Sequence, residues 1–193
     1  MARRKNEFRP DNQDAGLLHK LYLTKKQRQS ALRWLLYGVV CILALVLQDV
    51  VFSRLRFWDA VTDLPACAIL MTCVLLGAET GGLFTLVASM LFLFSGTAPG
   101  EYTIIALTVL GIIAAAFRQG YLRKGFSSTL LCTGTALMLY ELLVFITELF
   151  LEHTIPSRFG VFCLTGLLSW AAMPILYPIL LAIGKIGGET WKE

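Results

Sequence analysis

Charged residues are scarce in this sequence. They make up 16% of its 193 residues, whereas a soluble domain has about 25%. Apolar residues make up 56%, and the mean hydropathy is +0.68. Because the apolar residues gather in long blocks, a bilayer must bury most of them. A soluble globular protein is therefore excluded, and the length suits about one domain.

Groups that catalyse reactions or bind metals are also missing or scattered. The sequence has no Gly-x-x-x-x-Gly-Lys-Ser/Thr loop for phosphate and no Cys-x-x-Cys pair. Its two histidines, His19 and His153, lie in a tail and a loop without a nucleophile motif. The cysteines fall inside apolar blocks, where they pack as small apolar residues: Cys41, Cys67, Cys73, Cys132 and Cys163. We expect no catalytic residues, no metal, no cofactor and no nucleic-acid partner.

Six apolar blocks predict the fold. They cover residues 34–52, 64–78, 81–98, 103–117, 129–151 and 160–183. A membrane-spanning helix needs about 17–25 apolar residues, and four blocks reach this length, whereas 64–78 and 103–117 fall short. The sequence predicts an all-α integral membrane bundle of about six transmembrane helices over residues 34–184. A re-entrant hairpin formed by 64–78 and 81–98 stays open, because the charge pattern is the same for both arrangements.

Basic residues predict the orientation of the bundle. Nine of the 17 Lys and Arg residues lie in segment 1–33. A cytoplasmic N-terminus places 14 of the 17 on the cytoplasmic side, as the positive-inside rule requires. Both termini, including tail 185–193, are therefore predicted to be cytoplasmic. Within the basic segment, residues 16–29 could form an interfacial helix on anionic lipid, or the whole segment could be a solvated tail.

Glutamates inside the fifth block are the main candidates for function. Glu141 falls near the middle of the block, and Glu148 and Glu152 follow after seven and four more residues. At about 100° per residue these three side chains share one helical stripe with Gly134. An ionisable group at the bilayer centre costs about 2.5–3.5 kcal/mol. We expect Glu141 to be protonated and hydrogen-bonded or to contact a partner or ligand, with Glu148 as a second candidate.

Two further polar residues, Gln48 and Asp49, stand at the outer end of the first block. Gln48 could donate a hydrogen bond to Glu141, although their predicted depths differ by several residues. Asp49 is a candidate contact as well. The alternative for Asp49 is that it marks the end of the helix together with Arg54, five residues later.

A ladder of small residues predicts close helix packing. Gly77, Gly81, Thr85 and Ser89 recur every four residues, and such small residues let two helix backbones approach each other. The ladder predicts an interface, either within the chain or with a partner protein. It carries no information about a substrate.

The order of several landmarks resembles the family of the rod-shape-determining protein MreD. The resemblance covers roughly residues 35–150. Its landmarks are Leu47-Gln48, Pro65, Gly77 with Gly81, and Pro99-Gly100 leading to Leu110-Gly111. The chain departs from the family pattern at Thr85 and Ser89, where the family continues with glycine. It also has Leu93 or a neighbour where the family commonly places an aspartate, so no role of that aspartate is carried over.

The resemblance implies a non-enzymatic component of the cell-wall elongation machinery in the plasma membrane of rod-shaped bacteria. Such a scaffold would bind an MreC-like single-pass protein and connect to an MreB-like filament and to peptidoglycan synthases. MreD-like proteins also resemble the S-components of energy-coupling-factor transporters. The alternative function is therefore a vitamin-binding module, with Glu141, Glu148, Trp170 and Tyr177 lining a pocket that opens outward. A proton-coupled carrier would depend on Glu141 alone.

Overall fold

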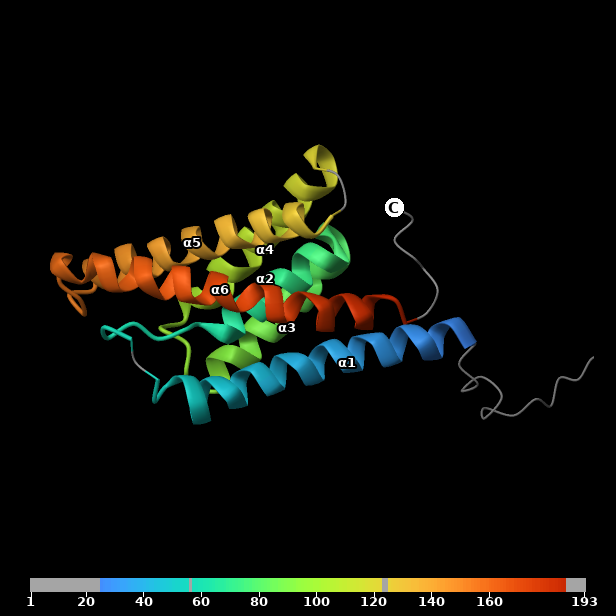
Figure 1. The fold of residues 1–193 in the computed structure, drawn as a ribbon, viewed down its shortest axis with the longest axis horizontal. Coiled ribbons are helices and arrows are strands. Elements are labelled where there is room, and N and C mark those ends of the chain that lie inside the picture. The colour runs from blue at the N-terminus through green and yellow to red at the C-terminus, as the bar shows by residue number, and fades with distance from the viewer. Residues whose placement is uncertain (1–24, 56, 123–124, 187–193) are drawn as a thin grey trace, which may run out of the picture.

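The computed structural model describes residues 25–55, 57–122 and 125–186 (Figure 1). These residues form six α-helices, which confirms the predicted all-α bundle. The helices are α1 Lys25–Leu47, α2 Leu64–Leu76, α3 Ala78–Phe94, α4 Tyr102–Tyr121, α5 Phe126–Phe150 and α6 Phe159–Gly184. A π-helical turn, Gln48–Phe52, continues α1, and a short 3₁₀ helix, Pro156–Arg158, precedes α6.

Four helical stretches are long and apolar enough to cross a membrane, so the chain is a multi-pass membrane protein. They are Arg28–Phe52, Tyr102–Tyr121, Phe126–Phe150 and Pro156–Gly184. The prediction had placed block 81–98 among the long segments and block 103–117 among the short ones, and here it was wrong. Helix α3 has 17 residues because the chain turns at Gly96, where φ is +73°. Helix α4 has 20 residues because it continues past Arg118, whose side chain is buried.

The ends of the bundle agree with an even number of crossings. The start of α1 and the end of α6 lie at the same end of the molecule (Figure 1). Helix α1 begins at Lys25, nine residues before the apolar block. The interfacial helix predicted over residues 16–29 lies mostly outside the described residues, and its last five residues belong to α1. Most of tail 185–193 also lies outside them.

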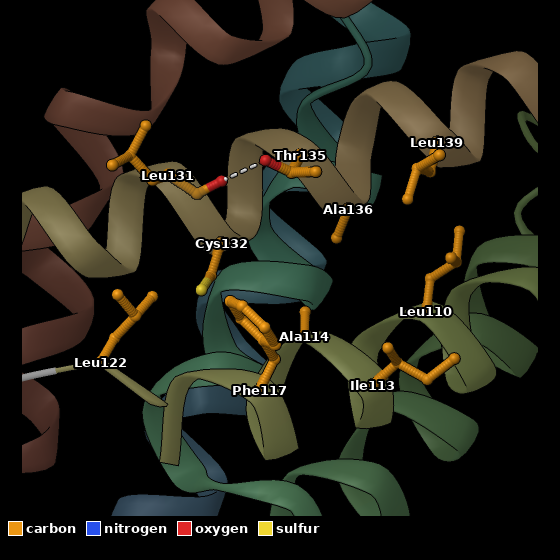
Figure 2. A pocket seen from close by; sticks show the side chains of 10 residues that line it. All are labelled: Leu110, Ile113, Ala114, Phe117, Leu122, Leu131, Cys132, Thr135, Ala136 and Leu139. Atoms are coloured by element: carbon orange, nitrogen blue, oxygen red, sulfur yellow. Dashed lines mark hydrogen bonds between the residues drawn. The ribbon is translucent and has the colours of Figure 1, made fainter. Parts of the chain in front are cut away.

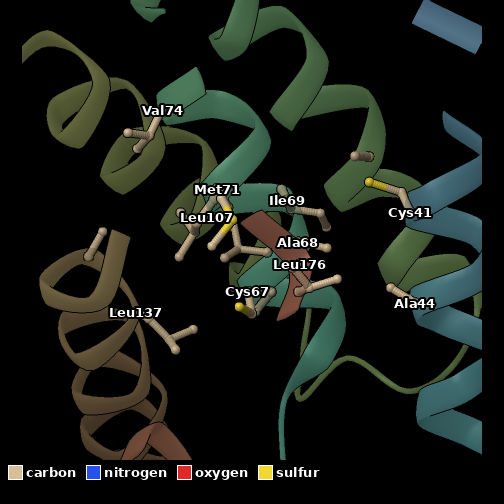
Figure 3. Packing of buried hydrophobic residues seen from close by; sticks show 14 of the residues in the cluster. Cys41, Ala44, Cys67, Ala68, Ile69, Met71, Val74, Leu107, Leu137 and Leu176 are labelled. Atoms are coloured by element: carbon tan, nitrogen blue, oxygen red, sulfur yellow. The ribbon is translucent and has the colours of Figure 1, made fainter. Parts of the chain in front are cut away.

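Helix α2 forms the core of the bundle. Twelve of its 13 residues are buried, and it packs against all five other α-helices. A helix that is apolar on every side must be surrounded, and its one hydroxyl, on Thr72, donates to Ala68 O at 2.7 Å. Figure 3 shows Met71 and Cys67 of α2 with Leu107 of α4 and Leu137 of α5 in the same cluster.

Helices α2 and α3 are joined by one residue and cross at close range. Gly77 separates them with φ +95°, a conformation that side chains disfavour. A Cβ on Gly81 would lie 2.4 Å from the backbone oxygen of Cys73. Gly81, Thr85 and Ser89 are all buried. The ladder residues of α3 therefore pack inside the chain, whereas Gly77 forms the break between the two helices.

Candidate functional site

Three segments hold the N-terminal end of α2. Asp63 caps the helix, because its Oδ1 accepts a hydrogen bond from Ala66 N at 3.1 Å. Gln48, at the end of the first membrane segment, accepts from Leu64 N through Oε1 at 3.1 Å. The backbone N–H of Asp63 donates to Ser169 Oγ of α6 at 2.7 Å. This end of α2 thus ties the first segment to α6.

Glu141 lies inside the bundle on α5. Its side chain is 6% exposed and faces α6, where a Cβ on Gly166 would lie 3.5 Å from Glu141 Cγ. Its Oε1 has no hydrogen-bond partner among the described residues. The charged groups that act on it, Asp63 and Glu148, are both acidic. Glu141 is therefore a buried acid without a counter-ion in the described part of the chain.

Hydroxyl groups complete the site, which we call the outer polar cluster: Asp63, Tyr102, Thr103, Tyr140 and Glu141. Electrostatic interactions link Tyr140 to Asp63, Glu141 and Tyr102, and Thr103 lies beside its hydroxyl. Tyr140 and Thr103 are fully buried. The Tyr102 hydroxyl has no hydrogen-bond partner within the described residues, and the neighbouring Thr103 and Tyr140 hydroxyls form no other hydrogen bond there. Buried polar groups normally have partners, so this cluster has unused capacity to bind protons, water or a polar ligand.

The predicted site residues differ in their exposure and in their distance from the outer polar cluster. Glu148 is half-buried on α5, seven residues after Glu141, and His153 acts on it electrostatically. Glu152 lies beyond the end of α5 with φ +59°, so the predicted stripe of three glutamates ends at Glu148. Asp49 is exposed and lies outside the cluster. Gln48 bonds to the backbone of Leu64 and not to Glu141.

Several cluster residues were missed in the sequence. The Asp63-Leu64-Pro65 run carries a helix-start signal, since aspartate is a preferred N-cap and proline suits the first turn. This signal could have identified Asp63. Thr103 and Tyr140 had no such signal. The sequence of an apolar block does not indicate which groups a hydroxyl within it contacts in the folded protein.

Protonation of Asp63 is expected to affect stability. Burial raises the pKa of Asp63 to about 6, against the opposing hydrogen bond from Ala66 N. The folded protein therefore holds this proton more tightly than the unfolded chain does. The stabilising contribution of the Asp63 proton to the free energy of unfolding is largest below about pH 4 and declines as the pH rises to about 6. Melting temperatures between pH 4 and 7 should decline for the wild type and should change less for Asp63→Asn.

The control for this experiment is Asp59→Asn, which changes an exposed aspartate of the same loop. It should keep the wild-type pH dependence. Equal slopes for Asp63→Asn and the wild type would show that Asp63 does not bind the proton.

The opposite end of α2 is also capped. Arg118 of α4 is 5% exposed, and its Nη1 donates to Val74 O in the last turn of α2 at 2.5 Å. Helix C-termini carry partial negative charge, which a cation stabilises. Gln119 lies against Gly77, where a Cβ would meet its Nε2. Both ends of the central helix thus depend on polar groups from its neighbours.

The chemistry of the outer polar cluster limits what it can bind. Two acids that interact in a buried site favour one shared proton, because two buried negative charges repel each other. Such a site can hold a proton or a ligand rich in hydrogen-bond donors.

Comparison with protein family models, with curated proteins and with solved structures found no match to this chain.

Proposed function

We propose that this protein is a non-enzymatic scaffold of the cell-wall elongation machinery in the bacterial plasma membrane. It binds an MreC-like single-pass protein and connects it to an MreB-like filament and to peptidoglycan synthases. The observation that supports this proposal is that most of the residues which carry the MreD resemblance meet at α2. The role itself comes from that resemblance.

Five of these landmarks have a physical task at the central helix. Gln48 accepts from the first turn of α2, and Pro65 lies in that turn. Gly77 ends the helix, and Gly81 allows α3 to cross it at Cys73. A Cβ on Gly111 of α4 would lie 3.1 Å from Cys73 Sγ. These five positions span 64 residues of the sequence and meet at one helix, and this arrangement supports the proposal.

The filled centre of the bundle also favours a scaffold. The axis through which a carrier would pass its substrate is occupied by α2, buried against all its neighbours. Carriers of known architecture place their sites at interrupted helices near the midplane. Among the described helices, α6 alone has prolines in its interior, Pro174 and Pro178.

Gentle purification from the native membrane tests the scaffold proposal. The tagged full chain is extracted in mild detergent, and the proteins that accompany it are identified by mass spectrometry. We expect an MreC-like protein and wall-synthesis enzymes. A pair of ATPases, or a vitamin in the purified sample, would overturn the proposal.

The outer polar cluster favours a second candidate, the vitamin-binding S-component. The observation is the set of buried groups without partners, above all Glu141 Oε1. A small molecule that donates hydrogen bonds would satisfy them.

Replacement of Glu141 by leucine separates the two candidates. Loss of an unpartnered buried acid is expected to raise the melting temperature by about 3–6 °C. In a scaffold, Glu141→Leu should retain its partners because the side chain is internal. In an S-component it should lose a vitamin that mass spectrometry detects with the wild type. Glu101→Leu, at an exposed position, is the control.

A further inference from the structure

The sides of the membrane-spanning helices expose large apolar side chains, which lipid must cover. Figure 2 shows four of these side chains on α4 and α5, each about half exposed: Ile113, Phe117, Leu131 and Leu139. The first spanning segment, Arg28–Phe52, exposes apolar side chains as far as Val50 and Val51 in its last turn. Its 25 residues are about 38 Å long at 1.5 Å per residue, whereas the hydrocarbon core of a bilayer is about 30 Å thick. The end of this segment therefore reaches the head-group region.

The exposed apolar surface continues past this segment onto a hairpin at residues 57–60. Leu55, Phe57 and Trp58 are all exposed, and the exposed fraction of Trp58 is 82%. The rings of Phe57 and Trp58 stack, with their centroids 5.9 Å apart and an interplanar angle of 10°. Tryptophan is enriched at membrane–water interfaces, because its ring is apolar and its indole N–H can donate a hydrogen bond. The hairpin thus carries an interfacial side chain directly after a membrane-spanning segment.

The backbone of the 57–60 hairpin holds Trp58 in this exposed position. Phe57 N donates to Ala60 O and Ala60 N donates to Phe57 O, both at 3.0 Å. Between them, Trp58 and Asp59 have φ angles of +51° and +64°. A two-residue turn of this kind prefers Asn-Gly, and a bulky residue keeps a positive φ only where its surroundings impose it. The turn therefore presents the indole from a fixed backbone and not from a flexible loop.

The bundle holds the other side of the hairpin. Ala60 is fully buried. Three residues later, Asp63 caps α2 and donates through its N–H to Ser169 of α6. The position of the hairpin is therefore coupled to the start of α2. With 13 residues, α2 is about 20 Å long and shorter than the hydrocarbon core, so its length alone does not fix its depth in the bilayer.

The size and the surroundings of the aromatic pair favour lipid over a protein partner. Two aromatic side chains bury about 300–500 Å² when they are covered completely, whereas each partner in a specific protein complex buries about 800 Å². Exposed charged residues, Arg54 and Asp59, flank the pair, and charged residues are depleted at the centres of protein interfaces. The exposed surface of the first spanning segment, which lipid already covers, leads directly to the hairpin.

We propose that the 57–60 hairpin inserts the rings of Phe57 and Trp58 into the boundary between the head groups and acyl chains of the surrounding leaflet. This contact fixes the depth of the N-terminal end of α2. The basic residues predict that the leaflet is the outer one. The contact does not depend on the scaffold function, because any multi-pass protein with this hairpin would make it.

Fluorescence quenching in nanodiscs tests the contact. The full chain is reconstituted at one copy per phosphatidylcholine nanodisc, so that no second copy covers the hairpin. The emission of Trp58 is the difference between the wild type and Trp58→Phe, an exposed substitution that leaves the other tryptophans in place. Acyl chains brominated near the head group should quench this emission at least about twofold more than chains brominated near their ends.

Two outcomes of the quenching experiment would overturn the proposal. Strong quenching by acrylamide, with none by either brominated lipid, would place the hairpin in water. Protection from acrylamide without quenching by either lipid would show that protein covers Trp58.

Hydrogen exchange in the same nanodiscs tests whether the hairpin fixes α2. Trp58→Ser should speed exchange in the first turn of α2 at least about threefold, because the anchor at this end is lost. The matched control, Phe94→Ser, removes an aromatic ring from a residue that is 84% exposed at the end of α3. It should leave this exchange unchanged. Equal exchange in Trp58→Ser and the wild type would contradict the fixing of α2.

Discussion

Replacing Gly81 by alanine is expected to lower the melting temperature of the purified protein by about 6–12 °C. The added Cβ would lie 2.4 Å from the backbone oxygen of Cys73 and 3.0 Å from its Cα. Backbone atoms cannot rotate away as a side chain can, so α2 and α3 must separate. Overpacking costs about 1–3 kcal/mol, and we take the upper value of about 3 kcal/mol because the clash is with the backbone. Each kcal/mol lowers the melting temperature by about 2–4 °C. Thermal unfolding followed by intrinsic fluorescence measures the effect.

The matched control is Gly38→Ala on α1. Nothing lies within 4 Å of a Cβ at this position, so the variant should melt within about 2 °C of the wild type. If Gly81→Ala were as stable as Gly38→Ala, the close crossing of α2 and α3 would be wrong. In that case the packing role of the small-residue ladder would have to be assigned to another surface.

The sequence predicted the helices better than their lengths. Long apolar blocks identify spanning segments because a helix that crosses the bilayer must be apolar over most of its length. Their ends depend on tertiary contacts, as α4 shows. The predicted block 103–117 ended directly before Arg118, since an arginine facing lipid is costly. Arg118 belongs to the helix because it bonds to Val74 O inside the bundle. A pattern along one segment cannot show a partner 44 residues away.

The candidate site was predicted in part. Glu141 was recognised as a candidate from its position, because a single acidic residue deep in an apolar block stands out in the sequence. The partner proposed for it was not found, since Gln48 bonds to the start of α2. Asp63 was missed because it lies in a loop, where an acid is ordinary. Only the fold shows that this loop residue interacts with Glu141.

Substitution of Arg118 by glutamine is expected to have the second-largest effect, a decrease of about 3–12 °C in melting temperature. The Arg118 Nη1 bond to Val74 O is charge-assisted, and hydrogen bonds to charged groups contribute about 1.5–3 kcal/mol. The variant also removes a cation from the C-terminal end of α2, where the helix dipole favours positive charge. Because α2 packs against every other helix, weakening this end destabilises the whole bundle.

Two readouts test whether Arg118 acts on α2 and not merely on general solubility. Hydrogen exchange should become faster in the last turn of α2, around Val74, and should change little around Asp63 at its other end. Arg158→Gln, at an exposed position before α6, should change neither the melting temperature nor the exchange. Unchanged exchange at the end of α2 in a destabilised Arg118→Gln would contradict the capping role. The two ends of the central helix can thus be examined separately, the C-terminal end through Arg118 and the N-terminal end through Asp63.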